Sequence, residues 1–239
     1  MHEHIAEAVK EPDVVAVPPG AVCLRFDTMK IYSALGAVRH LLDTGQITPG
    51  DTLVDSSSGI YAHALALACH RYGMKCHIVG STTVDRSVTF GAEHVQDPDM
   101  IIAGIGSSIP FENVRQELYD RVHWVNFDYA MSGAVELLRA SGIFAGLSAG
   151  AAYLATLAER ERDDSRTYVF IAADTGHRYV DSAYANHAQA HGLGSMRPHE
   201  VTSCADLSHP WSAMPWPPPR DDIQQSYAES SALLAETVR

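Results

Sequence analysis

Apolar residues recur at intervals of three and four between residues 29 and 42, the spacing that lines one face of an α-helix. The apolar positions are Met29, Leu35, Val38, Leu41 and Leu42. Gly45 follows as a helix stop signal. We therefore predict a helix over residues 29–42. It is preceded by the first apolar stretch, AVCLRF. Before that stretch, residues 1–20 form a polar, proline-containing segment, which we predict to be an arm or an edge strand.

Short apolar runs alternate with helical patterns along much of the chain. A run at 51–54 is followed by a serine-rich loop, by the Ala- and Leu-rich stretch YAHALALACHRYG and by a second run at 75–79. Strand, helix and strand in this order predict parallel strands joined by a right-handed crossover. Further helices are predicted over 113–119 and 131–138 and from the segment 146–150 to about 159, and a buried strand over 167–172. The expected fold class is α/β, with a parallel twisted sheet flanked by helices.

Two stretches depart from this alternation. Residues 81–99 have no sustained period, and beyond Tyr184 the chain becomes polar and then proline-rich, with three consecutive prolines at 217–219. We therefore divide the chain into an α/β region, residues 1–195, with an apparent internal shortening near 82–89, and a C-terminal extension, residues 196–239, that contains Pro and Trp.

Composition and charge exclude several classes of protein. The chain has 239 residues, 46% of them hydrophobic, and no run of about 18 apolar residues that could cross a membrane. No signal peptide is recognisable at the N-terminus. The formal net charge is −12 without an offsetting basic run, which disfavours nucleic acids and anionic membranes as partners. The four cysteines form no disulfide framework. We expect a cytoplasmic protein that binds neither nucleic acid nor membrane.

Five separated segments carry motifs in a fixed order. They are DTMK at 27–30 before a G-x-x-x-P-G turn, DSSSG at 55–59 before an Ala-rich helix, AGIGSSIP at 103–110, GLSAGAA at 146–152 and DTGHRY at 174–179. Together they resemble the motifs of cysteine synthase-like enzymes, the fold-type II family of pyridoxal-phosphate (PLP) enzymes that includes threonine dehydratases and tryptophan synthase β chains. The resemblance implies a two-lobed α/β fold and PLP as the cofactor.

The resemblance also implies roles for particular residues. Lys30 would be the lysine that binds PLP as a Schiff base, and only a primary amine can do this. The loop Ser57-Ser58-Gly59 would bind the substrate carboxylate, because free N–H groups and the positive end of a helix dipole favour an anion. Without the family, the same serines are simple helix caps. Tyr61 is also placed on the substrate side, where its phenol group could replace a hydroxyl group that relatives have and this chain lacks.

On the cofactor side, the resemblance points to Ser148, Ala149, Gly150 and Asp174 as contacts of the PLP ring. Two positions depart from the family pattern: Ile60 stands where an asparagine is usual, and Ala149 stands where a serine faces the ring nitrogen. Ser148, one residue away, could serve in a shifted register. The Gly/Thr-rich G-T-G-G-T cup that binds the cofactor phosphate does not occur in this sequence.

The length also departs from the family. Lys30 and Asp174 are 144 positions apart, whereas relatives place about a hundred more residues between them, enough for several βα units. Three explanations are open: the sequence omits an internal segment, the protein is a natural miniature, or a partner subunit supplies the missing half. We favour the first, because open sheet edges and exposed apolar helix faces are costly.

The resemblance implies β-replacement or β-elimination on an O-activated serine-type amino acid through an aminoacrylate intermediate. The alternative is a non-catalytic relative that acts as a binding or regulatory subunit. A homodimer is expected, since the family generally pairs. No metal site is predicted: His187 and His191 are four residues apart, but nothing in the sequence suggests a third ligand.

Overall fold

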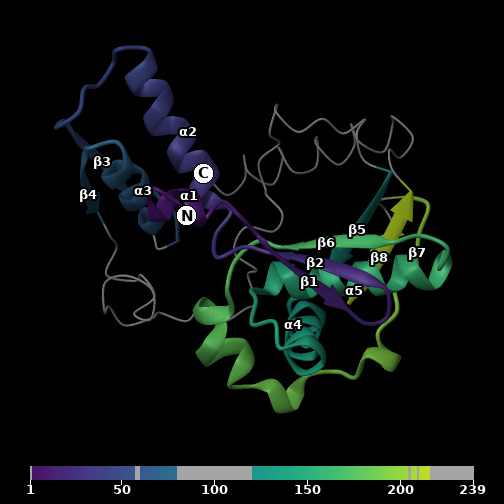
Figure 1. Ribbon diagram of the computed structural model, residues 1–239. Coiled ribbons are helices and arrows are strands. Elements are labelled where there is room, and N and C mark those ends of the chain that lie inside the picture. Colours follow the sequence, from purple (N-terminus) through teal and green to yellow (C-terminus); the bar gives the residue numbers. More distant parts are fainter. Residues whose placement is uncertain (1, 57–59, 80–119, 204–205, 209, 216–239) are drawn as a thin grey trace, which may run out of the picture.

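The structure, a computed structural model, describes residues 2–56, 60–79, 120–203, 206–208 and 210–215 (Figure 1). Several sequence-based predictions concern residues outside these ranges. They are the helix at 113–119, the motif at 103–110, the junction near 82–89 and the prolines at 217–219. The described elements form two groups in Figure 1, a smaller one around α2 and α3 and a larger one around α4 and α5.

The smaller group is built mainly from residues before Gly80. It contains α1 (Ile5–Ala8), α2 (Lys30–Asp43), β3 (Thr52–Ser56), α3 (Ile60–Arg71) and β4 (Lys75–Val79). Strands β3 and β4 pair in parallel, with Thr52 opposite Lys75. The predicted helix, strand–helix–strand order and parallel pairing are thus confirmed here.

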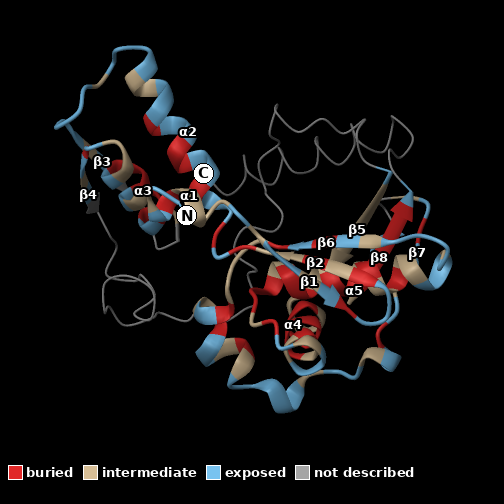
Figure 2. Cartoon of the chain, viewed as in Figure 1, coloured by how far each residue is buried: buried red, intermediate tan, exposed pale blue. Residues whose placement is uncertain are grey.

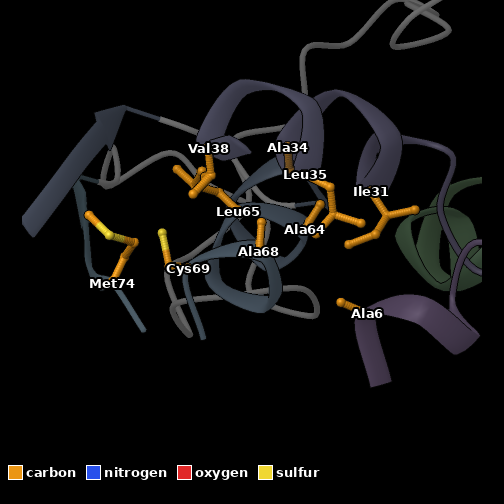
Figure 3. Close-up of a cluster of buried hydrophobic side chains, with 10 residues drawn as sticks. All are labelled: Ala6, Ile31, Ala34, Leu35, Val38, Ala64, Leu65, Ala68, Cys69 and Met74. Atoms are coloured by element: carbon orange, nitrogen blue, oxygen red, sulfur yellow. The ribbon is translucent and has the colours of Figure 1, made fainter. Parts of the chain in front are cut away.

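The core of this group lies between the two long helices (Figure 3). From α2 the apolar face inserts Ile31, Ala34, Leu35 and Val38. These residues meet apolar side chains of α3 and its surroundings, most of them small or sulfur-containing: Ala6, Ala64, Leu65, Ala68, Cys69 and Met74. The alternation of buried and exposed positions along α2 in Figure 2 follows the spacing seen in the sequence.

The larger group contains two three-stranded sheets and two long helices. One sheet has β1 (Asp13–Val17), β2 (Ala21–Arg25) and β6 (Tyr168–Ala172), in that order. The other has β5 (Arg121–Val125), β8 (Trp211–Pro215) and β7 (His199–Glu200). The pairs β2–β6 and β7–β8 are parallel, whereas β1–β2 and β5–β8 are antiparallel. The parallel pairs are therefore accompanied by antiparallel neighbours that the sequence did not indicate.

Helices α4 (Phe127–Ser141) and α5 (Leu147–Arg162) pack against each other beneath the β1–β2–β6 sheet (Figure 1). Asn126 caps α4 by accepting a hydrogen bond from the backbone N–H of Tyr129 at 3.0 Å. Gly142 ends α4 with a φ of +68°, a conformation that costs glycine little. The interval between the two helices therefore consists of only Gly142–Gly146, which makes them close neighbours.

The segment after β6 runs through four short helical turns rather than strands. They are the 3₁₀ turns at Gly176–Tyr179, His187–Gln189 and Leu193–Ser195 and the π turn at Val180–Tyr184. From residue 199 the chain enters the second sheet, where Trp211 is 2% exposed and packs with Leu154, Ala158 and Met196. The first part of the predicted C-terminal extension thus wraps onto the α/β region. No helix among the described residues is long and apolar enough to cross a membrane.

A polar network joins α5 to this wrapped segment. The Trp211 indole N–H donates to Nδ1 of His123 at 3.2 Å, and His123 Nε2 lies 3.0 Å from a Glu159 carboxylate oxygen. Arg121 Nε lies 2.7 Å from the same carboxylate, and Arg121 also pairs with Glu200. Because an indole only donates, His123 Nδ1 must be unprotonated in the folded protein. The network therefore holds His123 neutral.

This network predicts a pH-dependent stability. Burial lowers the pKa of His123 below its ordinary value, although the Glu159 carboxylate partly offsets the effect. The unfolded chain then binds the extra proton first, so the free energy of unfolding falls once the pH drops below about 6.5. The slope reaches up to about 1.4 kcal/mol per pH unit until the folded-state pKa is passed.

Urea unfolding between about pH 7.5 and pH 5.5 measures this slope for the native protein and for His123→Asn. Asparagine can still accept the indole hydrogen bond but does not titrate, so the slope should be shallower in the variant. Equal slopes in both proteins would assign the pH dependence to other groups.

Candidate functional site

Three segments that are distant in the sequence meet at Asp174, directly after β6. The backbone N–H of Met29 donates to Ala173 at 3.0 Å, and Thr28 forms a β-bridge with Asp174. On the other side, the N–H of Gly146 donates to the Asp174 carbonyl at 3.1 Å. The segments that carry Lys30, Ser148 and Asp174 are therefore joined by main-chain hydrogen bonds. Three of the five predicted motifs converge at one place.

Lys30 is the first residue of α2 and immediately follows this junction. Its backbone N–H donates to the hydroxyl of Thr28 at 3.2 Å, and Thr28 itself is 3% exposed. The Lys30 side chain is exposed among the described residues. Lys30 lies at the end of α2 that is nearer the larger group of elements (Figure 1).

The Asp174 carboxyl group lies over Gly146, at the N-cap of α5. A Cβ atom on Gly146 would lie 2.2 Å from Asp174 Oδ1, so only glycine leaves room for this carboxyl group. Burial raises the pKa of Asp174, while the charges of Lys30 and Arg178 and hydrogen bonding by Ser148 act in the opposite direction. Within the described residues, Oδ1 is buried and has no hydrogen-bond partner. A buried, unpaired acceptor is costly and is typical of a functional group.

These surroundings predict that Asp174→Asn stabilises the folded protein. A raised carboxyl pKa means that the folded state holds the proton more tightly than the unfolded chain does. Stability is therefore lost as the pH rises from the ordinary aspartate pKa through the folded-state value. Asparagine removes this penalty at neutral pH, by on the order of 1 kcal/mol.

Thermal unfolding at about pH 7 and about pH 4 measures the gain. The variant should unfold at a higher temperature at neutral pH, and its advantage should shrink in acid. A lower stability of Asp174→Asn at neutral pH would contradict the account.

The cofactor-side positions on α5 have different surroundings. Ser148 is half-buried and near Asp174. Ala149 is fully buried in the cluster shared with β2 and β6. Gly150 faces α4, where an added Cβ would lie 2.1 Å from the carbonyl oxygen of Ala130. The side-chain faces of Ala149 and Gly150 are thus used for packing, and contacts of these two residues with a cofactor remain a prediction.

The substrate-side positions are at the end of β3 and the start of α3. Ser57, Ser58 and Gly59 lie outside the described residues, between Ser56 and Ile60. Their predicted role in carboxylate binding therefore stays a prediction. Tyr61, in the first turn of α3, is partly buried against the core cluster of the smaller group.

Sequence reasoning missed several residues that shape the site. The motifs include Thr28, Gly146 and Arg178, but the resemblance assigns no function to these residues. Tyr184 gave no sequence signal. Its hydroxyl donates to the carbonyl of Ala145 at 2.5 Å, and burial raises its pKa to about 12. Its ring packs 4.8 Å from that of Phe144. Tyr184 therefore holds in place the backbone segment that leads into Gly146.

Comparison with known proteins gives relatives that match part of the sequence. No family model matches the chain. Cysteine synthase of Haemophilus influenzae is 33% identical over 99 residues, which are 41% of this chain and 31% of that protein. Cysteine synthase A of Escherichia coli is 34% identical over 84 residues, which are 34% of this chain and 26% of that protein. The chain thus matches about a third or less of these relatives, and the first of them is about a third longer than this chain.

Solved structures match more of the chain but at lower identity. Cysteine synthase of Entamoeba histolytica superposes with a TM-score of 0.57 at 15% identity, covering 84% of this chain and 93% of that one. O-ureido-L-serine synthase superposes with a TM-score of 0.58 at 16% identity, covering 76% and 94%. At such identities the superpositions show the fold, and they confirm the predicted fold class. The chain therefore has the fold of these solved structures and is similar in sequence to cysteine synthases over part of its length.

Proposed function

We propose that the protein is a PLP-dependent enzyme that performs β-replacement or β-elimination on an O-activated serine-type amino acid. The observation that carries the proposal is the convergence of the segments of Lys30, Ser148 and Asp174, which are joined by the hydrogen bonds of Met29 and Gly146. A chance resemblance of short motifs gives no reason for the motifs to meet in space. The sequence relationship to cysteine synthases supports the same reaction class.

The residues present fit one end of the cofactor. Lys30 offers an exposed primary amine, and the nearby Asp174 has a buried oxygen for which the described part of the chain provides no hydrogen-bond partner. Ser148 lies beside the same carboxyl group. An amine that can condense with an aldehyde and polar groups that can face a ring nitrogen are thus adjacent. Bound PLP would supply the electron sink that stabilises negative charge at the substrate α-carbon.

In this arrangement each residue has a defined task. The Nζ atom of Lys30 would hold the cofactor and, once displaced by the substrate amine, accept the α-proton. The loop of Ser57, Ser58 and Gly59 precedes the first turn of α3, where free N–H groups favour the substrate carboxylate. A raised pKa allows Asp174 to keep or release a proton beside the ring.

One feature favours a second candidate function. The sequence contains no Gly/Thr-rich cup for the cofactor phosphate, and the side chain of Ala149 carries no polar group. A protein that retains the fold without binding the cofactor would act as a binding or regulatory subunit. The retained Lys30 favours the enzyme. The proposal also includes a homodimer and a cytoplasmic location, as expected from the sequence.

The reaction can be tested directly on the full chain supplied with PLP. We expect O-acetyl-L-serine to be consumed with release of acetate in either case: with sulfide the other product is cysteine, and with water alone the other products are pyruvate and ammonia. Mass spectrometry of the products distinguishes the two outcomes. No consumption of O-acetyl-L-serine, together with no retention of PLP after gel filtration, would favour the non-catalytic candidate.

A further inference from the structure

Two cysteines meet where α3 ends and β4 begins. Cys69 is in the last turn of α3, and Cys76 is the second residue of β4. Cys69 is 1% exposed and belongs to the core cluster of the smaller group, while Cys76 is half-buried and packs against the same cluster. Both are free thiols in the structure. Neither residue takes part in the candidate functional site.

The short connection between α3 and β4 brings the two residues together. The backbone N–H of Met74 donates to the Cys69 carbonyl at 2.8 Å, and Gly73 turns the chain there with a φ of +68°. Met74 and Cys69 are accordingly neighbours at one end of the cluster (Figure 3). Side chains alternate along a strand, so Cys76 shares the inner face of β4 with Met74, whereas Lys75 is exposed. The Cys76 side chain is therefore on the side of β4 that packs on the core.

The two thiols also interact directly. Burial is the main cause that raises the pKa of Cys69 to about 12, and the charge and hydrogen bonding of Cys76 raise it as well. Cys23 is a useful contrast: burial also raises the pKa of this cysteine, but among the described residues no second thiol acts on it. A disulfide requires two cysteine side chains that face each other at close range. Cys69 and Cys76 meet this requirement.

We propose that Cys69 and Cys76 form a reversible disulfide by exchange with a low-molecular-weight disulfide, which makes the α3–β4 junction a redox modification site. The Cys76 thiolate attacks one sulfur of the oxidant, the S–S bond of the oxidant breaks, and its other half leaves and takes up a proton. The Cys69 thiolate then attacks the Cys76 sulfur and releases the second half in the same way. The protein loses two thiol hydrogens with two electrons, and the oxidant becomes two thiols.

Burial assigns the order of the two steps. Cys76 is partly exposed and can meet the oxidant, whereas Cys69 is enclosed by the core. Once Cys76 is joined to the oxidant it carries no charge, so one of the effects that raise the pKa of Cys69 disappears before the second step. In the reduced pair Cys69 stays protonated at neutral pH. Ionisation of Cys69 therefore does not stabilise the dithiol against oxidation.

The modification site is separate from the predicted substrate loop. Residues 57–59 precede the first turn of α3, whereas the cysteine pair is at the last turn of the same helix. The proposal therefore does not rest on the proposed function. In a reducing compartment, disulfides of this kind are usually transient and respond to the thiol–disulfide balance.

Peptide mapping of the full chain tests the proposal. The reduced protein is incubated at neutral pH with oxidised glutathione, the remaining thiols are trapped with N-ethylmaleimide in acid, and the chain is digested with trypsin. Trypsin cleaves after Arg71 and Lys75, so Cys69 and Cys76 fall in separate peptides that only a disulfide can join. We expect joined peptides from the native chain and from Cys23→Ala, the matched control, because Cys23 is also fully buried.

Variants of the pair test the order of the steps. Cys69→Ala and Cys76→Ala should both lose the joined peptides, and Cys69→Ala should instead accumulate glutathione on Cys76. Circular dichroism in the same buffer establishes that each variant is folded.

The outcomes decide between a specific pair and general thiol reactivity. Joined peptides of Cys69 and Cys76 that separate again when reduced glutathione is added support the proposal. Two free thiols after prolonged incubation overturn it, and so does a native chain that keeps glutathione on Cys76 without closing the disulfide. Equal amounts of links to Cys23 or Cys204 would also overturn it, because they would show pairing without regard to the fold. None of these outcomes depends on whether the protein is catalytic.

Discussion

Gly150→Ala is expected to destabilise the protein by about 3 kcal/mol or more, which is among the larger effects of a single methyl group. The added Cβ would lie 2.1 Å from the carbonyl oxygen of Ala130 and 2.5 Å from the backbone nitrogen of Ala134. Both atoms belong to the main chain of α4, so rotation of a side chain cannot relieve the clash. Helices α4 and α5 would have to separate, and their shared core would loosen. The reciprocal position, Gly133, is equally closed, since its Cβ would lie 2.4 Å from the Gly150 carbonyl.

Gly36→Ala is the matched control for this prediction. Gly36 is exposed in α2, and an added Cβ would meet no atom of the described residues within 4 Å. Alanine there should stabilise the protein by about 0.5–1 kcal/mol, because glycine is a poor helix former. Urea unfolding measures both variants. Similar midpoints for Gly150→Ala and the native chain would show that α4 and α5 are not in contact as described.

Lys30→Ala is expected to lower the turnover of O-acetyl-L-serine by about 10³-fold or more. In the proposed function the same amine holds the cofactor and accepts the α-proton, and no neighbouring side chain can replace a primary amine in both tasks. The fold should be unaffected, since the Lys30 side chain is exposed. Initial rates and a thermal melt of the same preparation measure the two effects.

Lysine occurs at only two other positions, Lys10 and Lys75, and both provide controls. Lys75 is exposed at the start of β4, and Lys10 pairs with Glu7 of α1. Alanine at either position should leave the turnover nearly unchanged. A Lys30→Ala protein as active as Lys75→Ala would remove Lys30 from the reaction.

Local patterns in the sequence predicted the elements whose packing is also local. The helix at 29–42 and the strand–helix–strand unit that follows it bury faces against one another within a short stretch of chain, so their periodicity is visible. Strand β5 was missed because its partner, β8, is about 90 residues away and ends in a proline. A hydrogen bond between Trp211 and His123 joins the two strands, and no hydrophobic periodicity in the sequence links these two residues.

The candidate site shows the same division. Lys30, Ser148 and Asp174 could be named from motifs, since each lies at the start of a helix or the end of a strand. The sequence could not show that the Asp174 carboxyl group requires the empty space above Gly146, because that contact joins β6 to the start of α5. The GLSAGAA motif resembles a cofactor loop, whereas in the structure its Gly150 packs against α4.

The central claim is that Lys30 holds the cofactor. The most direct measurement is the visible absorption spectrum of the full chain with PLP, followed by borohydride reduction and mass spectrometry of the peptides. The account predicts a yellow protein whose reduced cofactor is attached to Lys30 and not to Lys10 or Lys75, and a Lys30→Ala protein without the band. A colourless protein, or a cofactor attached equally to all three lysines, would contradict it.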